Sequence, residues 1–111
     1  MDTIQYADFE KIDLRVGTIM HALVFEKAIK PAYQLTIDFG PLGTKKSSAQ
    51  ITEQYTVEEL IGKQVIAVVN FPAKQIADYM SECLVLGVIG SSNGVILLST
   101  DKPVANGMRI A

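Results

Sequence analysis

Short segments in which every second residue is apolar are the feature that most constrains the fold of this chain. The clearest one places apolar side chains at alternate positions: Tyr33, Leu35, Ile37 and Phe39. Such alternation is typical of a strand with one buried face. Val and Ile together number 22 against 9 Leu, and β-branched residues favour strands over helices. The sequence therefore predicts a mostly β protein with five or six short strands.

Turn-forming residues separate these segments and place one short helix among them. The turn at Gly40–Gly43 predicts that residues 45–52 are the hairpin partner of residues 33–39. Thr56 and Glu59 have the spacing of a capping box, which begins a helix. Elements in this order match an all-β fold, the five-stranded Greek-key barrel of the OB type, and other small β-barrels give much the same pattern. One short helix lies between strands 3 and 4 of the OB-type barrel, and terminal segments flank the barrel.

Three further features complete the expected order of elements. Gly17 lies inside the first strand pattern and predicts a bulge. Residues 73–82 are expected to form a polar connector. Asn93-Gly94 predicts a hairpin turn that joins a strand at residues 83–89 to its return strand at 95–100.

The length and the cysteine and histidine counts limit the chemistry of the chain. A length of 111 residues suits a single domain, residues 1–111, with little room for an elaborate catalytic cleft. One cysteine, Cys83, and one histidine, His21, make neither a disulfide nor a four-ligand structural zinc site. Cys83 begins an apolar strand and is expected to be a buried structural thiol rather than a nucleophile. We therefore expect a protein that is not an enzyme, with no catalytic residue, metal or cofactor.

The first residues and the apolar segments bear on where the chain acts. The N-terminus lacks the basic and apolar regions of a signal peptide. No apolar run approaches the ~18–20 residues of a membrane span. We therefore expect a cytoplasmic protein that does not insert into membranes.

The charge of the chain is unevenly distributed. A net charge of −2 argues against a strongly basic nucleic-acid-binding domain. Residues 27–74, however, carry a net +2 between two acidic flanks, and they include the hairpin that forms the ligand face of an OB barrel. The candidate ligand-binding residues of this face are basic or neutral hydrogen-bonding side chains: Arg15, Lys45, Lys46, Ser48, Gln50, Asn70 and Lys74. Such groups contact phosphates; a solvated strand face with ordinary surface lysines is the alternative interpretation.

Aromatic residues are few, and Trp is absent. Single-stranded nucleic acid is held largely by bases stacking on exposed rings, while Tyr33 and Phe39 lie on the apolar face of their strand and are expected in the core. This argues against a high-affinity single-strand binder. Recognition of a folded RNA or of an apolar peptide fits better.

Three stretches of the chain resemble the tRNA-binding-domain branch of the OB fold, which occurs free-standing and appended to some aminoacyl-tRNA synthetases. They are residues 9–19 (FEKIDLRVGTI), 63–72 (KQVIAVVNFP) and 81–87 (SECLVLG). Residues 46–52 (KSSAQIT), together with the Asn-Phe-Pro of 70–72, resemble the CsaA family of bacterial secretion chaperones. The resemblance runs from about residue 7 to the C-terminus, nearly the whole chain.

The resemblance implies a homodimer joined through segments that flank the barrel, with a ligand surface around the open face of the barrel. It implies binding of unfolded, export-destined polypeptides, with tRNA and the translocation machinery as further candidate partners. Position by position, it adds Ser81 to the candidate site and supports Ser48 and Asn70, flanked by the lysines. It makes Gly17 and Arg15 part of one motif and leaves two roles open for Arg15, contact with the ligand or a hold on Asp13 or a neighbouring carbonyl. We assign Gly17 to structure and Arg15 to the ligand face.

One position departs from the tRNA-binding pattern. Many tRNA-binding members carry Met three residues after the serine that corresponds to Ser81, and this chain has Leu84 there. The departure favours the chaperone-like branch. We therefore expect a homodimeric, non-enzymatic chaperone that binds preproteins in an apolar groove rimmed by Lys45, Lys46 and Lys74. A structure-specific tRNA-binding protein that uses the same lysines is the alternative.

Overall fold

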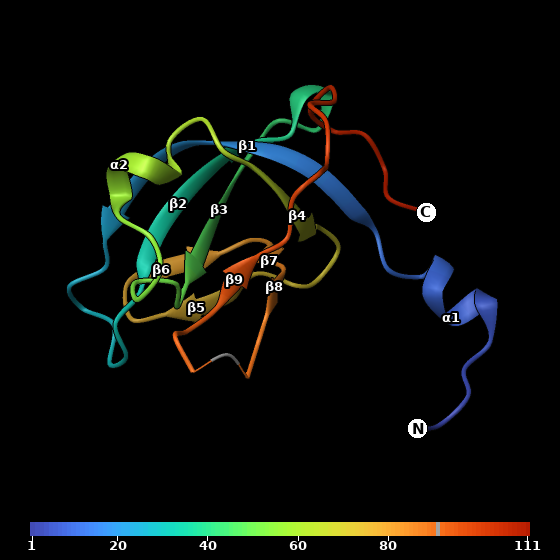
Figure 1. Cartoon of the computed structure of the whole chain (residues 1–111), viewed down its shortest axis with the longest axis horizontal. Coiled ribbons are helices and arrows are strands. Elements are labelled where there is room, and N and C mark those ends of the chain that lie inside the picture. Colours follow the sequence, from blue (N-terminus) through green and yellow to red (C-terminus); the bar gives the residue numbers. More distant parts are fainter. Residues whose placement is uncertain (91) are drawn as a thin grey trace.

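Five antiparallel strands form a sheet that curls into a nearly closed barrel (Figure 1). We describe a computed structural model, which covers residues 1–90 and 92–111. The strands of this sheet are β1 (Leu14–Val24), β2 (Tyr33–Asp38), β3 (Thr44–Ala49), β4 (Gln64–Val68) and β7 (Leu84–Val85). They lie in the order β3-β2-β1-β4-β7. The predicted OB-type barrel is confirmed.

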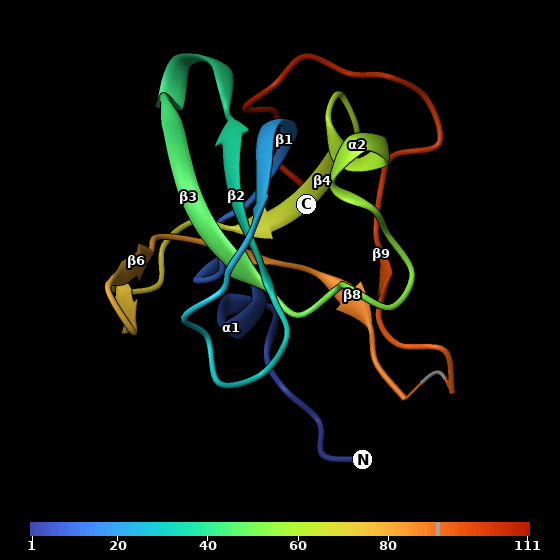
Figure 2. The ribbon, with the colours of Figure 1, turned by 90° about the vertical axis from the view of Figure 1, so that its left-hand side faces the viewer.

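Two small hairpins and three short helical segments complete the described chain. The hairpins are β5 (Lys74–Ile76) with β6 (Tyr79–Ser81), and β8 (Gly87–Val88) with β9 (Ile96–Leu97). The helical segments are α1 (Tyr6–Glu10), α2 (Val57–Leu60) and the 3-10 turn η1 (Gly40–Leu42). Figures 1 and 2 show both hairpins on the same side of the barrel, away from η1.

The alternation of β2 builds the core. The apolar side chains of this alternation, Tyr33, Leu35 and Ile37 in β2 and Phe39 just after it, are all buried, as predicted. Residues of β1 and β4 complete the core from the neighbouring strands, among them Ile19 and Val65. β2 pairs with β3 over its whole length, from Tyr33 opposite Ala49 to Asp38 opposite Thr44. The expected hairpin is therefore present.

Gly17 does not form the predicted bulge. The register of β1 with β2 shifts between Ile19 and His21 instead. A Cβ at Gly17 would lie 2.6 Å from a methyl of Ile37 and 2.8 Å from the ring of Phe39. The glycine is thus required because the two core side chains press against the backbone of β1.

The chain from residue 73 to 89 differs from the expectation in two places. The predicted polar connector contains the β5–β6 hairpin, whose turn holds Ala77 at a φ of 53°. The predicted single strand at 83–89 is divided at Leu86. The Leu86 N–H donates to the Ile66 carbonyl in β4, whereas the Leu86 carbonyl accepts from the Leu98 N–H. The chain therefore changes its pairing partner at Leu86.

Both helices begin with side-chain contacts of the capping-box kind. At α2 the Thr56 hydroxyl accepts from the Glu59 N–H, and the Glu59 carboxylate accepts from the Thr56 N–H, as predicted. At α1, which the sequence did not predict, the Asp8 carboxylate accepts from the Gln5 N–H. No residue of α1 is buried, and the helix stands clear of the barrel in Figure 1. No described helix is long and apolar enough to cross a membrane.

Candidate functional site

The barrel closes where β3 meets the segment that precedes β7. The Ser47 hydroxyl donates to the Cys83 carbonyl at 3.1 Å, and the Ser48 N–H donates to the Ser81 hydroxyl at 3.1 Å. Next to them, Lys46 exchanges two hydrogen bonds with Glu82, through the Glu82 N–H and carboxylate. Most contacts at this edge of β3 are therefore made by side chains, because no complete strand ladder forms there.

Three hollows meet around Lys74, on the side of the barrel that carries the hairpins. The first, which we call the Phe71 hollow, has a volume of about 600 Å³ and lies between residues 71–75 and 81–84. The second, the loop hollow, has a volume of about 620 Å³ and lies between β5 and the β1–β2 loop. The third, the central groove, has a volume of about 420 Å³. Lys74 lines all three.

The central groove is mainly apolar. Its large apolar side chains are Ile51, Ile76, Leu84, Val85, Leu86, Ile89, Val95 and Leu97. Its polar residues are Ser48 in β3, Gln50 just after β3, and Lys74 and Ser81 in the β5–β6 hairpin. Four of the eight predicted ligand residues therefore lie together on one surface.

Lys45 and Lys46 lie next to this surface rather than in it. The Lys46 ammonium is 5.8 Å from the ring centroid of Tyr79, in position for a cation–π contact. Lys45 is half-buried, on the opposite face of β3 from Lys46. Neither lysine lines the three hollows.

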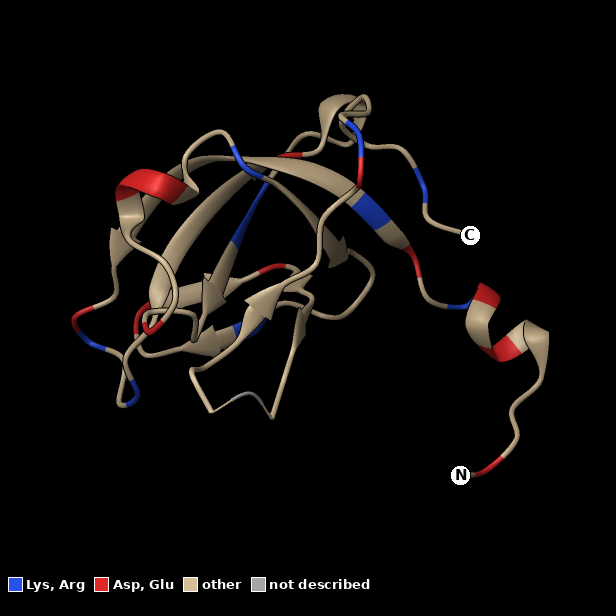
Figure 3. Cartoon of the chain, in the orientation of Figure 1, with Lys and Arg blue, Asp and Glu red and all other residues tan. Residues whose placement is uncertain are grey.

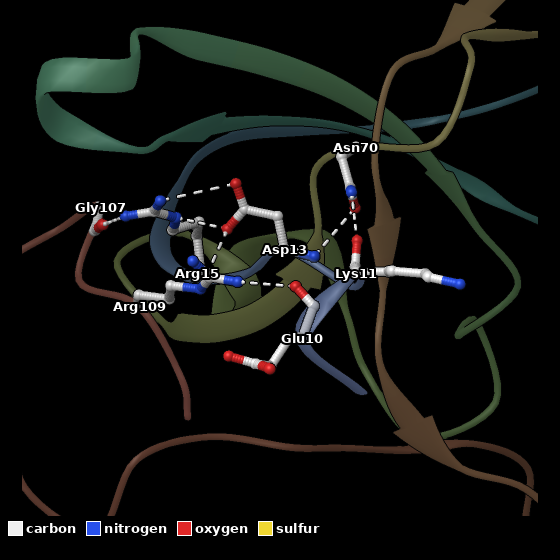
Figure 4. A network of polar contacts seen from close by, with 7 residues as sticks. All are labelled: Glu10, Lys11, Asp13, Arg15, Asn70, Gly107 and Arg109. Carbon is white, nitrogen blue, oxygen red and sulfur yellow. Dashed lines mark hydrogen bonds and ion pairs between the residues drawn. The ribbon is translucent and has the colours of Figure 1, made fainter. Parts of the chain in front are cut away.

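Arg15 and Asn70 lie in a separate polar network that joins the terminal segments to the barrel (Figure 4). The Arg15 guanidinium donates to Asp13 at 2.6 Å and to the Gly107 carbonyl at 3.0 Å. The Asn70 amide accepts from the Asp13 N–H at 2.9 Å and donates to the Lys11 carbonyl at 2.7 Å. These two predicted ligand residues are engaged within the chain, and neither lines a hollow around Lys74.

Arg109 completes this network from the C-terminal side. Its guanidinium donates to the Glu10 carbonyl at 3.1 Å and lies 3.9 Å from the Asp13 carboxylate. The segment after α1 and the tail before Ala111 are thereby held against the start of β1.

Lysines dominate the charge around the loop hollow. The β1–β2 loop carries Lys27 and Lys30, and Figure 3 shows this loop apart from the acidic helix α2. Lys27 forms an ion pair with Asp78 at 2.8 Å. The hydrogen bond from Lys27 lowers the pKa of the Asp78 carboxyl, and the same contact raises the pKa of Lys27. Within the described residues, Lys30 and Lys74 have no ion pair, which leaves their charges available to a ligand.

The titratable groups near the hollows are not arranged for nucleophilic catalysis. Cys83 is buried, as predicted, and burial raises the pKa of its thiol to about 11, against a smaller lowering by the charge of Lys45. Burial also raises the pKa of Tyr79 to about 12, and Glu82 adds to the rise. His21 is exposed on β1. Within residues 1–90 and 92–111, no group of three or more His, Cys, Asp or Glu could hold a metal ion.

Apart from Leu84, the sequence did not point to the individual apolar residues of this surface. Phe71 is 55% exposed and lines the Phe71 hollow, and Ile89 is 81% exposed in the central groove. Phe71 could have been found from the sequence, because it stands next to Pro72, shortly after the buried strand β4 has ended. The other groove residues come from strand patterns that indicate only core positions.

Comparisons with known proteins agree on one family. The family model "Putative tRNA binding domain" matches residues 14–109. The crystal structure of the chaperone CsaA from Bacillus anthracis is 48% identical in sequence, with a TM-score of 0.94, and the match covers 99% of this chain and 100% of that one. The CsaA chaperone protein from Picrophilus torridus is 55% identical, with a TM-score of 0.92, over 98% of this chain and 100% of that one.

Curated relatives include larger enzymes that contain a similar segment. A methionine–tRNA ligase from Methanococcoides burtonii is 34% identical over 101 residues, which is 91% of this chain. The chain spans only 15% of the length of that ligase. The similarity to the ligase is therefore confined to a segment the size of the tRNA-binding domain.

Proposed function

The chain belongs to the tRNA-binding-domain family, in its CsaA branch, and from this premise we propose that it is a homodimeric, non-enzymatic chaperone. It binds unfolded, export-destined polypeptides in the cytoplasm and releases them to the translocation machinery. Residues 1–111 act as a single domain in this role. The similarity to CsaA chaperones over the whole chain supports the proposal.

The observation that carries this function is the central groove with its polar edge. Its apolar side chains give an unfolded polypeptide a place to bury side chains that water disfavours. Ser48, Gln50, Lys74 and Ser81 border it, and they offer hydrogen bonds and positive charge to the backbone and to acidic groups. Lys46 extends the basic border along β3, whereas Lys45 lies on the other face of the strand. We assign Arg15 and Asn70 a positioning role.

Exposed apolar residues at the termini support the dimer. Ile4 and Tyr6 are 67% and 69% exposed, and Met108 is 56% exposed. Clusters of exposed large apolar residues mark interaction sites in soluble proteins. A second copy of the chain would cover these segments, which lie apart from the three hollows.

A tRNA-binding protein is the second candidate. The family model and the ligase segments favour it, and the unpaired charges of Lys30 and Lys74 suit phosphate groups. On this account, Lys45 and Lys46 make further phosphate contacts, and Ser48, Asn70 and Ser81 add neutral ones.

Binding titrations with two ligands at several salt concentrations separate the candidates. We expect a fluorescently labelled, permanently unfolded polypeptide to bind with an affinity that changes only a few-fold between about 50 and 200 mM salt, since apolar burial is weakly screened. Binding of tRNA through several lysines would instead fall steeply with salt. Steep salt dependence with tRNA, and no binding of the polypeptide, would establish the second candidate in place of the first.

A matched pair of leucine variants locates the polypeptide site. Leu84 in the central groove is 48% exposed, and Leu42 in η1, outside the hollows, is 44% exposed. We expect Leu84→Asn to weaken polypeptide binding about 10-fold, the loss of most of one apolar contact. Leu42→Asn leaves it unchanged. Equal effects of the two variants would argue against the central groove.

A further inference from the structure

Along the edge of β3 that faces away from β2, only some of the backbone groups have hydrogen-bond partners within the chain. β3 is the last strand in the order of its sheet. In an antiparallel pair, alternate residues direct their backbone groups toward the partner and away from it. Lys46 and Ser48 are the residues whose groups point away, since their N–H groups bond to Glu82 and Ser81 rather than to β2.

The Ser48 N–H is the last backbone group along this edge that bonds to the segment at residues 81–83. The Lys46 N–H and carbonyl are satisfied by Glu82 at 2.9 and 2.7 Å, and the Ser48 N–H by the Ser81 hydroxyl at 3.1 Å. The next groups along this edge are the Ser48 carbonyl and the Gln50 N–H, for which the described residues supply no partner. Ser48 and Gln50 line both the loop hollow and the central groove. An acceptor and a donor at the spacing of a strand edge are therefore open to a ligand.

These two groups match a polypeptide backbone. A peptide in extended conformation offers an N–H and a carbonyl at the same spacing, and its side chains alternate between two directions. A nucleic-acid backbone has no N–H to donate to the Ser48 carbonyl. The apolar lining of the central groove lies beside this edge, and Lys30 and Lys74 carry unpaired positive charges in the loop hollow that Ser48 and Gln50 also line.

We propose that an extended polypeptide segment adds as a short strand to β3 at Ser48 and Gln50. Its alternate apolar side chains enter the central groove, and an acidic residue lies against Lys74 or Lys30. This inference rests on the proposed polypeptide-binding function and specifies how the chain holds its ligand. Binding through the backbone makes the site tolerant of sequence, because the ligand needs only alternating apolar side chains and one acidic residue.

Backbone N-methylation of a peptide probe tests the pairing. The probe is a short synthetic peptide with Val or Leu at alternate positions and one Glu, and its affinity is measured by fluorescence anisotropy. In two analogues, N-methyl groups remove the N–H donors at either the odd or the even positions. We expect one analogue to bind about 3- to 10-fold more weakly, the loss of one or two hydrogen bonds, and the other to bind like the parent.

Variants of Gln50 provide the same test from the side of the protein. Gln50→Pro removes the backbone N–H at the end of β3, where the extended residue before it tolerates proline. Gln50→Ala keeps the N–H and removes only the side chain. We expect the proline variant to bind about 3- to 10-fold more weakly than the alanine variant, so that the comparison separates the backbone N–H from the side chain.

The outcomes separate this inference from the proposed function. If the parent peptide binds and both N-methylated analogues bind equally, capture occurs through side chains alone and the strand addition is wrong. If the parent peptide does not bind while tRNA does, the polypeptide-binding function itself is wrong. The titrations with N-methylated peptides test the strand addition even if Gln50→Pro fails to fold.

Discussion

Cys83 lies where the barrel closes and is fixed by its surroundings. Its carbonyl accepts from the Ser47 hydroxyl, and its thiol lies 3.8 Å from the Lys46 carbonyl. Only 6% of the residue is exposed. An ionised thiol would lose its hydration at this position, which is why burial raises its pKa. The thiol is a core group of the barrel rather than a reactive one.

The raised pKa of the Cys83 thiol predicts that the stability of the fold depends on pH. Above the ordinary thiol pKa of 9.0, Cys83 ionises in the unfolded chain, whereas in the folded chain it stays protonated until about pH 11. The unfolded state is therefore favoured as the pH rises from 9 to 11. We expect the free energy of unfolding to fall by about 2 kcal/mol more in the wild type than in Cys83→Ala over this range. Denaturant titrations at pH 8 and pH 11 measure it, and parallel losses in both proteins would contradict this assignment.

Residues that the sequence predicts as ligand contacts on similar grounds have different roles in the fold. Ser48, Gln50, Lys74 and Ser81 meet around one groove. Arg15 and Asn70 were predicted with them, but they contact backbone groups far along the chain: Arg15 reaches Gly107, 92 residues away, and Asn70 reaches Asp13, 57 residues away. No local pattern encodes such partners, so the sequence could not distinguish a ligand side chain from one that holds the termini.

At the scale of elements, the strength of the local pattern decided what could be predicted. β2 follows from its alternation, and α2 from its capping box. The β5–β6 hairpin has three-residue strands and a turn at Ala77-Asp78, without the glycine that hairpin turns usually show. α1 has five residues and no buried face, so its sequence lacks amphipathic periodicity. Both exist because contacts distant in sequence support them.

Asn70 holds the segment between α1 and β1 in position. Because the N-terminal segment belongs to the proposed dimer interface, Asn70 should also affect the dimer. Asn70→Ala removes two hydrogen bonds to the backbone of residues 11–13. We expect α1 to lose its fixed position and the dissociation constant of the dimer to rise about 10-fold, which corresponds to a loss of about 1.4 kcal/mol of ordering in the dimer. Light scattering over a concentration series measures the mass, which for the wild type should be twice the chain mass of 12.1 kDa.

Gln54→Ala is the matched control for this prediction. The Gln54 amide also donates to a distant backbone carbonyl, that of Asn93, at 2.8 Å. It lies outside the terminal network, so its loss should leave the dimer unchanged. A wild-type protein that is monomeric at micromolar concentration would refute the dimer, and equal effects of the two variants would refute the role of Asn70.

At the scale of the whole molecule, the ligand surface is a consequence of how the barrel closes. The central groove takes residues from β3, from the β5–β6 hairpin and from the chain between residues 84 and 97. These segments meet because residues 81–83 bond to β3. The sequence predicts the barrel from its strands, and the resemblance to its family supplies several polar residues. An apolar groove is also expected, but most of the apolar residues that line it are identified only once the three-dimensional closure is known.

Chemical-shift mapping of ligand binding tests the central claim most directly. A permanently unfolded polypeptide is titrated into the ¹⁵N-labelled protein, and the amide shifts are followed residue by residue. We predict changes concentrated at residues 48–50, 74–76 and 81–84, with little change in η1 on the opposite side of the barrel. Changes confined to η1 and the terminal segments, or none at a polypeptide concentration that saturates binding, would contradict the assignment of the groove around Lys74 as the binding surface.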